Sequence, residues 1–379
     1  MACTHPLKGF VLGVKSDGKR ILRIVPYEVD YLFCDLSGNF HCYQHADYSG
    51  SHIMSNGQVC FEARSPPVSG PRERLIMDCL QIPCGQCEAC RLQKSRDWAN
   101  RCMLELEYHT SSYFVTLTYD DDHVPTRFYA DPADGEVSGE VQTLVKKDFQ
   151  DFLKRLRKRF KDQKIRYYAC GEYGPATWRP HFHAILFGLQ LDDLQVYERD
   201  TRGYTYYTSQ SLSDVWSIYR RGGQSGSGSG SYESLGRVVV GQVTWETCAY
   251  TARYILKKLT GPYAKFYEDF NLEPPFTLMS TNPGLARQWY DDHPDVMDYE
   301  YISIKTPTGG RKFRPPRYYD RLFDVDDPEA SAVKKELRRK MAEQAQAAKL
   351  SRTSMSYLEL LAVEEHQLKN RIKKLERKL

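Results

Sequence analysis

The chain has 379 residues, with a hydrophobic content of 41% and a charged content of 27%, which is ordinary for a globular protein of two or three domains. No run of about 18 apolar residues occurs, so no membrane-spanning helix is expected. The start, MACTHPLKGF, lacks the basic-then-apolar order of a secretory signal. We therefore expect the 11 cysteines to be reduced thiols or metal ligands rather than a disulfide framework.

The net charge is only +4, but basic residues are concentrated in two segments. Residues 331–379 contain 13 Lys and Arg against 6 Asp and Glu, and residues 146–166 contain 10 against 3, so each segment has a net charge of +7. Two basic patches can attract a polyanion although the whole chain is nearly neutral. The aromatic content of 13% suits stacking on unpaired bases, and it suits a tyrosine-rich β protein equally well.

Residues 1–90 form a Cys-rich region of short apolar runs separated by Gly, Asp and Pro, and we expect several short strands there. The region ends in a dense cysteine group with the spacing C-x2-C-x2-C at its end: Cys79, Cys84, Cys87 and Cys90. Thiolates that converge from a turn are suitable ligands for zinc or an iron–sulfur centre. A structural Zn²⁺ needs four ligands, and either Cys79 or Cys102 could complete the set. Free thiols in a loop are the alternative.

Residues 91–264 contain the clearest alternation of helices and strands. β-Branched and aromatic residues predict strands, and apolar residues at helical spacing predict helices. The predicted strands are 113–119, 165–170, 181–187 and 237–245, and the predicted helices are 91–109, 146–163 and 248–259. Residues 125–143 and the Gly/Ser-rich stretch 221–236 are expected to be loops.

The helix predicted at 146–163 combines an apolar stripe with a strongly basic remainder. Basic side chains on an exposed helix face can contact DNA phosphates. We expect DNA contacts from this face and from one arginine that precedes a pair of histidines: Lys154, Arg155, Arg157, Lys158, Arg159 and Arg179.

The last third of the chain has two parts. Residues 265–330 are rich in Pro and Tyr, and an irregular region is expected there. Residues 331–379 are predicted to be a basic helical tail that ends in a short heptad seam: Leu358, Leu361, Glu365, Leu368, Ile372, Leu375 and Leu379. The tail could hold DNA through its charge, pack on the body of the protein or mediate self-association through the seam.

Two histidines stand one residue apart in the run WRPHFHAILF at 178–187. Positions i and i+2 of a β-strand point to the same face, so His181 and His183 could hold one metal ion. Antiparallel pairing of 165–171 with 181–187 would place Glu172 beside them. Two imidazoles and a carboxylate leave coordination positions open for phosphate oxygens, and we expect Mg²⁺ or Mn²⁺. Two ordinary histidines at a strand end are the alternative.

Two tyrosines stand four residues apart in the helix predicted at 248–259. The hydroxyls of Tyr250 and Tyr254 therefore fall on one helix face, which Lys258 continues. A phenol has a pKa of about 10 and is a poor nucleophile until nearby positive charge activates it. Together with a metal site, this arrangement predicts tyrosine attack on a DNA phosphodiester, whereas helix packing with a solvated lysine is the alternative.

Three segments occur in a characteristic order: FVTLTY at 114–119, CGEYG with RPHFHAILFG within 170–188, and YTARYILKK at 250–258. They resemble the three motifs of the HUH endonucleases, and their wording is similar to the rolling-circle replication initiators of Microviridae phages, gokushovirus branch. The resemblance implies an α+β fold of the ferredoxin or RRM type, an antiparallel sheet with helices packed on one side. It also implies site roles: His181 and His183 as metal ligands, Glu172 as the acidic third ligand, Tyr250 and Tyr254 as nucleophiles and Lys258 as the lysine beside them.

The resemblance further implies an initiator that nicks phage origin DNA, stays attached through a 5′-phosphotyrosine and rejoins single strands in the cytoplasm of the bacterial host. No Walker loop of the form GxxxxGK[ST] occurs, so unwinding would require a host helicase and the host replication machinery. A plasmid relaxase or an HUH transposase would share this chemistry. A non-catalytic, Cys-rich nucleic-acid-binding protein is the alternative of another class.

Overall fold

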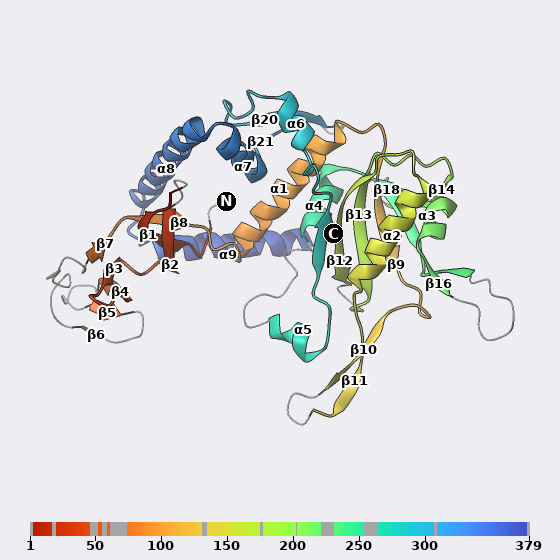
Figure 1. Cartoon of the computed structure of the whole chain (residues 1–379), viewed down its shortest axis with the longest axis horizontal. Helices are drawn as coiled ribbons and strands as arrows, with labels where there is room; N and C mark the ends of the chain where they lie inside the picture. Colours follow the sequence, from red (N-terminus) through yellow and green to blue (C-terminus); the bar gives the residue numbers. More distant parts are fainter. Residues whose placement is uncertain are drawn as a thin grey trace. The chain divides into compact units, whose positions relative to one another are not determined.

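A computed structural model describes residues 3–16, 20–45, 52–54, 59–60, 74–130, 135–174, 177–201, 203–220, 231–253, 264–306 and 309–376 (Figure 1). The chain divides into two compact units, Leu92–Gln344 and Met1–Arg91 with Ala345–Leu379. Among the described residues, no helix combines the length and the apolar character that crossing a membrane requires.

The centre of Leu92–Gln344 is a seven-stranded sheet in the order β14-β15-β18-β9-β13-β12-β19, and all of its neighbouring strands run antiparallel. Its strands are β9 (Ser112–Thr118), β12 (Arg166–Tyr173), β13 (Pro180–Phe187), β14 (Leu194–Arg199), β15 (Thr205–Ser209), β18 (Val238–Gln242) and β19 (Phe276–Met279). The four strands predicted from sequence are therefore present. β13 lies at the centre because its side chains are apolar on one face and half apolar on the other, which suits a strand covered on both sides.

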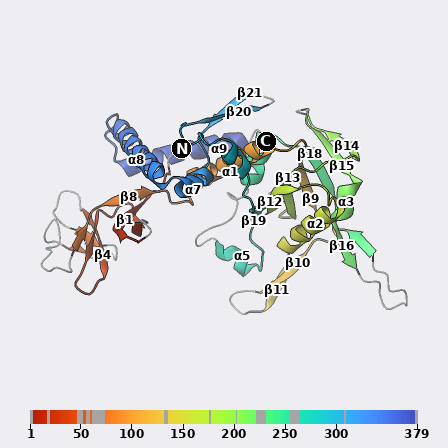
Figure 2. The ribbon, with the colours of Figure 1, turned by 45° about the horizontal axis from the view of Figure 1, so that its top comes forward.

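Helices cover both faces of this sheet, and Figure 2 shows α2 lying against one of them. On that face, α2 (Lys146–Arg159) buries Phe149 and Phe152 in the same apolar cluster as Phe182 of β13. On the other face, α1 (Glu88–Leu106) and α4 (Trp245–Arg253) pack against Phe114 and Ile185. The expected α+β class with an antiparallel sheet is confirmed. The second helical layer is a refinement of the one-sided plan, because α1 and α4 have small or apolar residues that the histidine face can bury.

Shorter elements complete this unit. They are β10 (Thr126–Ala130), β11 (Val137–Gln142), α3 (Gln210–Val215), β16 (Ser217–Arg220), β17 (Ser231–Ser234), α5 (Lys265–Asp269), α6 (Arg287–Asp292), β20 (Ile302–Thr306), β21 (Gly309–Phe313) and α7 (Arg317–Asp326). β10 and β11 form a hairpin where a loop was expected at 125–143. Residues 265–330 also contain regular elements, because buried aromatic contacts such as Trp289 with Tyr319 stabilise segments that lack sequence periodicity.

The unit of Met1–Arg91 and Ala345–Leu379 contains two small antiparallel sheets with the orders β2-β1-β8 and β6-β5-β4-β3-β7. Their strands are β1 (Leu7–Val14), β2 (Arg20–Pro26), β3 (Tyr31–Cys34), β4 (Phe40–His45), β5 (His52–Met54), β6 (Val59–Cys60), β7 (Arg74–Ile76) and β8 (Cys79–Ile82). The predicted short strands are thus present.

The predicted helical tail consists of α8 (Pro328–Leu350) and α9 (Tyr357–Glu376). α9 packs within its own unit: the Tyr357 ring lies 5.5 Å from that of Tyr27, and its hydroxyl accepts a hydrogen bond of 2.9 Å from Gln81. Leu361 and Leu368 of the heptad seam are buried. Of the alternatives left open by the sequence, the structure therefore contains packing of the seam on the protein itself.

Candidate active site

His181 and His183 leave one face of β13, and Glu172 leaves the same face of the neighbouring β12. The antiparallel register pairs Glu172 with His181 and Cys170 with His183, as the sequence predicted. Nε2 of His181 lies 2.8 Å from Oε1 of Glu172, and Nε2 of His183 lies 3.2 Å from the same oxygen. Adjacent ligands of an octahedral ion with bonds of about 2.1 Å are about 3.0 Å apart, so the three atoms fit the corner of one such ion.

The outer nitrogens of both histidines also have oxygen partners. Nδ1 of His181 lies 3.1 Å from the backbone oxygen of Arg179, and Nδ1 of His183 lies 3.0 Å from Oγ1 of Thr116 on β9. Metal-binding histidines typically donate their second N–H to such an oxygen, which orients the ring. With protonated Nδ1 atoms on both rings, the Nε2 atoms that face Glu172 have the lone pairs that a metal requires.

Burial and charge prepare the carboxylate for a cation. Only 2% of Glu172 and 6% of His183 are exposed to solvent. Burial alone would raise the pKa of Glu172, but hydrogen bonds and positive charge from the two histidines outweigh it and lower this pKa from 4.5 to about 2. The group is therefore ionised at neutral pH, and it presents one buried negative charge beside two imidazoles.

Tyr250 lies beside these ligands on α4. Its ring is 5.2 Å from the ring of His183, edge to face, and 6.3 Å from the ring of Phe114. The side chain is 42% exposed, so it borders both the ligand set and solvent. The other two residues predicted for this helix face, Tyr254 and Lys258, lie outside the described residues.

The position of Tyr250 follows from how α4 begins and packs. Thr244 and Thr247 form a reciprocal cap, in which each backbone N–H donates to the hydroxyl of the other at 2.9 and 3.2 Å. Small residues then bring the helix close to its neighbours, since Ala249 and Ala252 are buried and the oxygen of Ala249 accepts a hydrogen bond from Ser95 of α1. The cap and this close packing hold Tyr250 over the edge of the histidine face.

The residues predicted to contact DNA occupy two places. The five basic residues from α2 lie on the helix that covers the opposite face of the sheet from the histidines: Lys154, Arg155, Arg157, Lys158 and Arg159. Three of them line a cavity of about 670 Å³ together with Tyr232: Arg155, Lys158 and Arg159. Only Arg179 lies next to the ligand set, through the contact of its backbone oxygen with His181.

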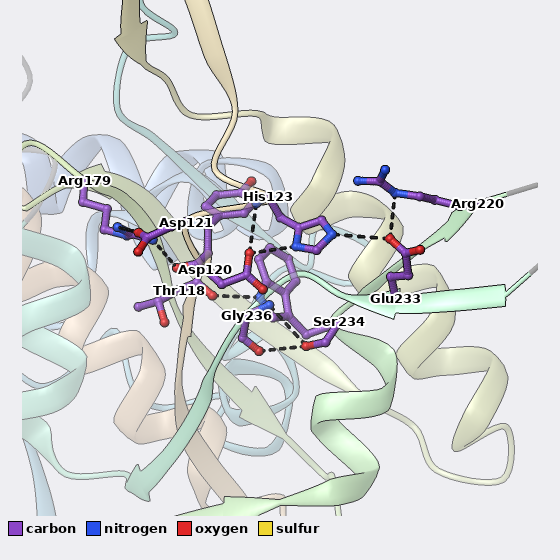
Figure 3. A network of polar contacts seen from close by, with 11 residues as sticks. Thr118, Asp120, Asp121, His123, Arg179, Arg220, Glu233, Ser234 and Gly236 are labelled. Carbon is purple, nitrogen blue, oxygen red and sulfur yellow. Dashed lines mark hydrogen bonds and ion pairs between the residues drawn. The ribbon is translucent and has the colours of Figure 1, made fainter.

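A polar network holds the end of β9 near Arg179 (Figure 3). Arg179 pairs with Asp121 at 2.5 Å and donates to the backbone oxygen of Tyr119. The carboxylate of Asp120 accepts from the backbone and ring nitrogens of His123, whose other nitrogen lies 3.5 Å from Glu233 of β17. These contacts connect the strand that contains Thr116 to the hairpin β16–β17.

The cysteine group lies in the unit that contains the N-terminus. Four thiols lie within 4.8 Å of one another there: Cys3, Cys84, Cys87 and Cys90. Three of the four predicted residues are therefore brought together, and the fourth position belongs to Cys3 rather than to Cys79 or Cys102. Sequence reasoning missed Cys3 because 81 residues separate it from Cys84, although an incomplete triad of cysteines was a reason to search the rest of the chain.

Comparisons with known proteins bear on this site. A family model described as replication-associated protein ORF2 matches residues 112–259. The chain is also 30% identical over 304 residues to replication-associated protein ORF2 of Spiroplasma virus 4, which covers 79% of this chain and 85% of that protein. The chain belongs to this family of phage replication-associated proteins. The resemblance to replication proteins of Microviridae-type phages is thus confirmed.

Two further phage replication-associated proteins are similar to the chain. VP4 of Bdellovibrio phage phiMH2K is 27% identical over 256 residues, which is 65% of this chain and 69% of that protein. ORF4 of Chlamydia phage 1 is 28% identical over 189 residues, which is 47% of this chain and 38% of that protein. No solved structure matches the chain. The segment that matches the replication-associated family model contains β9, β12, β13 and α4, and so all the ligand and tyrosine candidates of the site.

Proposed function

We propose that this replication-associated protein initiates rolling-circle replication of a single-stranded DNA phage by nicking origin DNA. In this proposal, Tyr250 attacks a phosphodiester beside a metal ion held by Glu172, His181 and His183. The observation that carries the proposal is the distance of 5.2 Å between the rings of Tyr250 and His183. A nucleophile at this position borders a ligand set with open coordination positions, as phosphoryl transfer requires.

The ligand set fits a divalent ion that accepts both nitrogen and oxygen, such as Mn²⁺, and Mg²⁺ through its oxygen ligands. Its three donor atoms converge, and the two outer nitrogens have oxygen partners. When bound, such an ion would withdraw electron density from the phosphate that is attacked. The protein residues would orient the substrate and provide the nucleophile.

The reaction exchanges one phosphate ester for another. Oη of Tyr250 forms a bond to phosphorus and loses its proton to water, while the bond from phosphorus to the 3′ oxygen breaks. The 3′ oxygen takes up a proton, so the products are a 5′-phosphotyrosine and a free 3′-OH. Tyr254 would provide the second nucleophile for rejoining, and Lys258 would supply positive charge for the attack.

The substrate proposed for this reaction is single-stranded origin DNA. The basic residues of α2 and of the helical tail provide positive charge for DNA binding, and their contribution would weaken with added salt. A host helicase would open the duplex in the cytoplasm of the bacterial host. A relaxase or transposase would use the same residues on a transfer origin or a hairpin end.

Covalent capture tests the proposal. The protein is incubated with a labelled origin oligonucleotide and Mn²⁺, and SDS-stable adducts are resolved on a gel. We expect an adduct that disappears in the double variant Tyr250→Phe/Tyr254→Phe and in His181→Ala. The matched control is Tyr204→Phe, because Tyr204 is also 42% exposed but belongs to the loop between β14 and β15. Salt-sensitive binding of the wild type without any adduct would refute the proposal and favour a non-catalytic DNA-binding role.

A further inference from the structure

The pairing of β1 with β8 explains why Cys3 meets Cys84. Leu7 at the start of β1 pairs with Ile82 at the end of β8, so the chain that precedes β1 and the chain that follows β8 leave the same end of the ladder. Cys3 is four residues before Leu7, and Cys84 is two residues after Ile82. Cys79 pairs with Phe10 at the other end. Three residues of strand, about 10 Å, separate it from Ile82.

The distances between the four thiols fit one tetrahedral ion. Sγ of Cys3 lies 3.5 Å from Sγ of Cys84 and 3.8 Å from Sγ of Cys87, and all four sulfur atoms lie within 4.8 Å of one another. A tetrahedral zinc with Zn–S bonds of about 2.3 Å separates its sulfur ligands by about 3.8 Å. A disulfide would require about 2.05 Å. The spacing thus matches thiolates around one ion, and it does not match bonded pairs.

The backbone around these thiols is arranged to stabilise negative sulfur. The backbone N–H of Cys84 donates to Sγ of Cys3, and that of Cys87 donates to Sγ of Cys84, both at 3.3 Å. Gly85 has a φ of +74°, which closes the turn between Cys84 and Cys87 in a conformation that favours glycine. Cys90 lies in the first turn of α1, where the positive end of the helix dipole favours thiolates.

We propose that Cys3, Cys84, Cys87 and Cys90 bind one structural zinc ion. The ion joins the N-terminal segment to the start of α1 and closes a loop of 81 residues. Four thiolates in a tetrahedral arrangement are the ligands of structural zinc, and they leave no position open for a substrate. The proposal is independent of the nicking chemistry, because no residue of the tyrosine and histidine site belongs to this unit.

The ion would contribute to folding because the unit that it joins buries little apolar surface. The apolar cluster described in this unit contains five buried side chains: Phe10, Val25, Val29, Leu32 and Ile76. Small units of this kind commonly depend on a metal or on disulfides for stability. Binding of zinc to a site that does not exist in the unfolded chain adds its free energy to folding.

Metal analysis of the full-length chain tests the proposal. The protein is purified anaerobically as the variant His181→Ala/His183→Ala, so that zinc at the other site does not contribute, and its metals are measured by mass spectrometry. We expect about one zinc ion per chain. Cys3→Ser and Cys84→Ser should reduce this value at least tenfold, whereas the matched control Cys79→Ser should leave it unchanged. Zinc that survives Cys3→Ser, or that is lost in Cys79→Ser alone, would overturn the proposed ligand set.

A second measurement needs no cysteine variant and so does not depend on whether such variants fold. X-ray absorption at the zinc edge of the same protein should show four sulfur ligands at about 2.3 Å. Nitrogen or oxygen in the first coordination shell would contradict the four-thiolate site. Iron in place of zinc in the purified protein, or neither metal, would equally refute the proposal.

Discussion

Oγ1 of Thr116 lies 3.0 Å from Nδ1 of His183, and the two residues are direct partners in the pairing of β9 with β13. Thr116 belongs to the FVTLTY segment, so this segment contributes a hydroxyl to the ligand set as well as a strand to the sheet. A hydrogen bond from Nδ1–H to this hydroxyl directs Nε2 of His183 towards Glu172. Thr116 is therefore a positioning residue for a metal ligand.

Replacement of Thr116 should weaken metal binding without loss of the fold. Thr116→Val keeps the β-branched shape but removes the hydroxyl, and we expect a decrease in Mn²⁺ affinity of roughly 10- to 100-fold. Thr116→Ser should restore most of the affinity. Mn²⁺ binding can be followed by electron paramagnetic resonance. The control is Thr118→Val on the same strand, because the Thr118 hydroxyl donates to Arg237 instead; equal losses in both variants would argue against the positioning role.

The charge of Glu172 should make the metal-free protein sensitive to acid. Its folded-state pKa of about 2 lies below its usual value of 4.5, so between these values the folded protein binds fewer protons than the unfolded chain. The stabilising contribution is complete above about pH 5 and is lost as the pH falls towards 2, with an upper limit on the order of 3 kcal/mol. Urea unfolding of chelator-treated wild type and Glu172→Gln from pH 2.5 to 6 measures it. A stability difference that does not grow with pH would contradict this assignment.

The buried ion pair of Glu105 and Arg166 should be important for the stability of the unit that contains the seven-stranded sheet. The two groups are in contact at 2.5 Å, and Glu105 also accepts a hydrogen bond from the backbone N–H of Ala286. Glu105→Gln leaves Arg166 buried without its counter-charge, and we expect a loss of about 3–5 kcal/mol in the free energy of unfolding. Glu300→Gln is the matched control, since its pair with Arg314 is exposed and should contribute less than about 1 kcal/mol. Similar losses in the two variants, measured by urea unfolding, would exclude a special role for the buried pair.

A glycine determines how closely β17 and β18 approach the end of β9. Gly236 has a φ of +143°, and a Cβ atom there would lie 2.3 Å from the backbone oxygen of Thr118. Gly236→Ala should therefore displace the end of β9, with a loss of roughly 2–4 kcal/mol and a decrease in adduct formation. Gly310→Ala in β21 is the control, because nothing lies within 4 Å of its added Cβ. Wild-type thermal stability of Gly236→Ala would show that the strand end adjusts without cost.

Part of the site could be predicted from local spacing alone. His181 and His183 share a strand face because side chains alternate along a strand. The antiparallel pairing that brings Glu172 to them was also predictable, since only a short connection separates the two strands. The prediction of Tyr250 as a neighbour of the histidines required the resemblance, because nothing in the helix itself indicates which face of the sheet it covers.

By itself, the sequence determined the α+β class, the strands and helices of the centre, the ligand candidates and the family. These features depend on periodicity and on motifs within a few residues of one another. Only the tertiary structure decided that Thr116 supports His183, that α1 and α4 cover the histidine face and that Cys3, rather than Cys79, completes the thiol group. Each of these depends on the register or packing of segments far apart in the chain, and a shift of one residue in register turns every side chain to the other face.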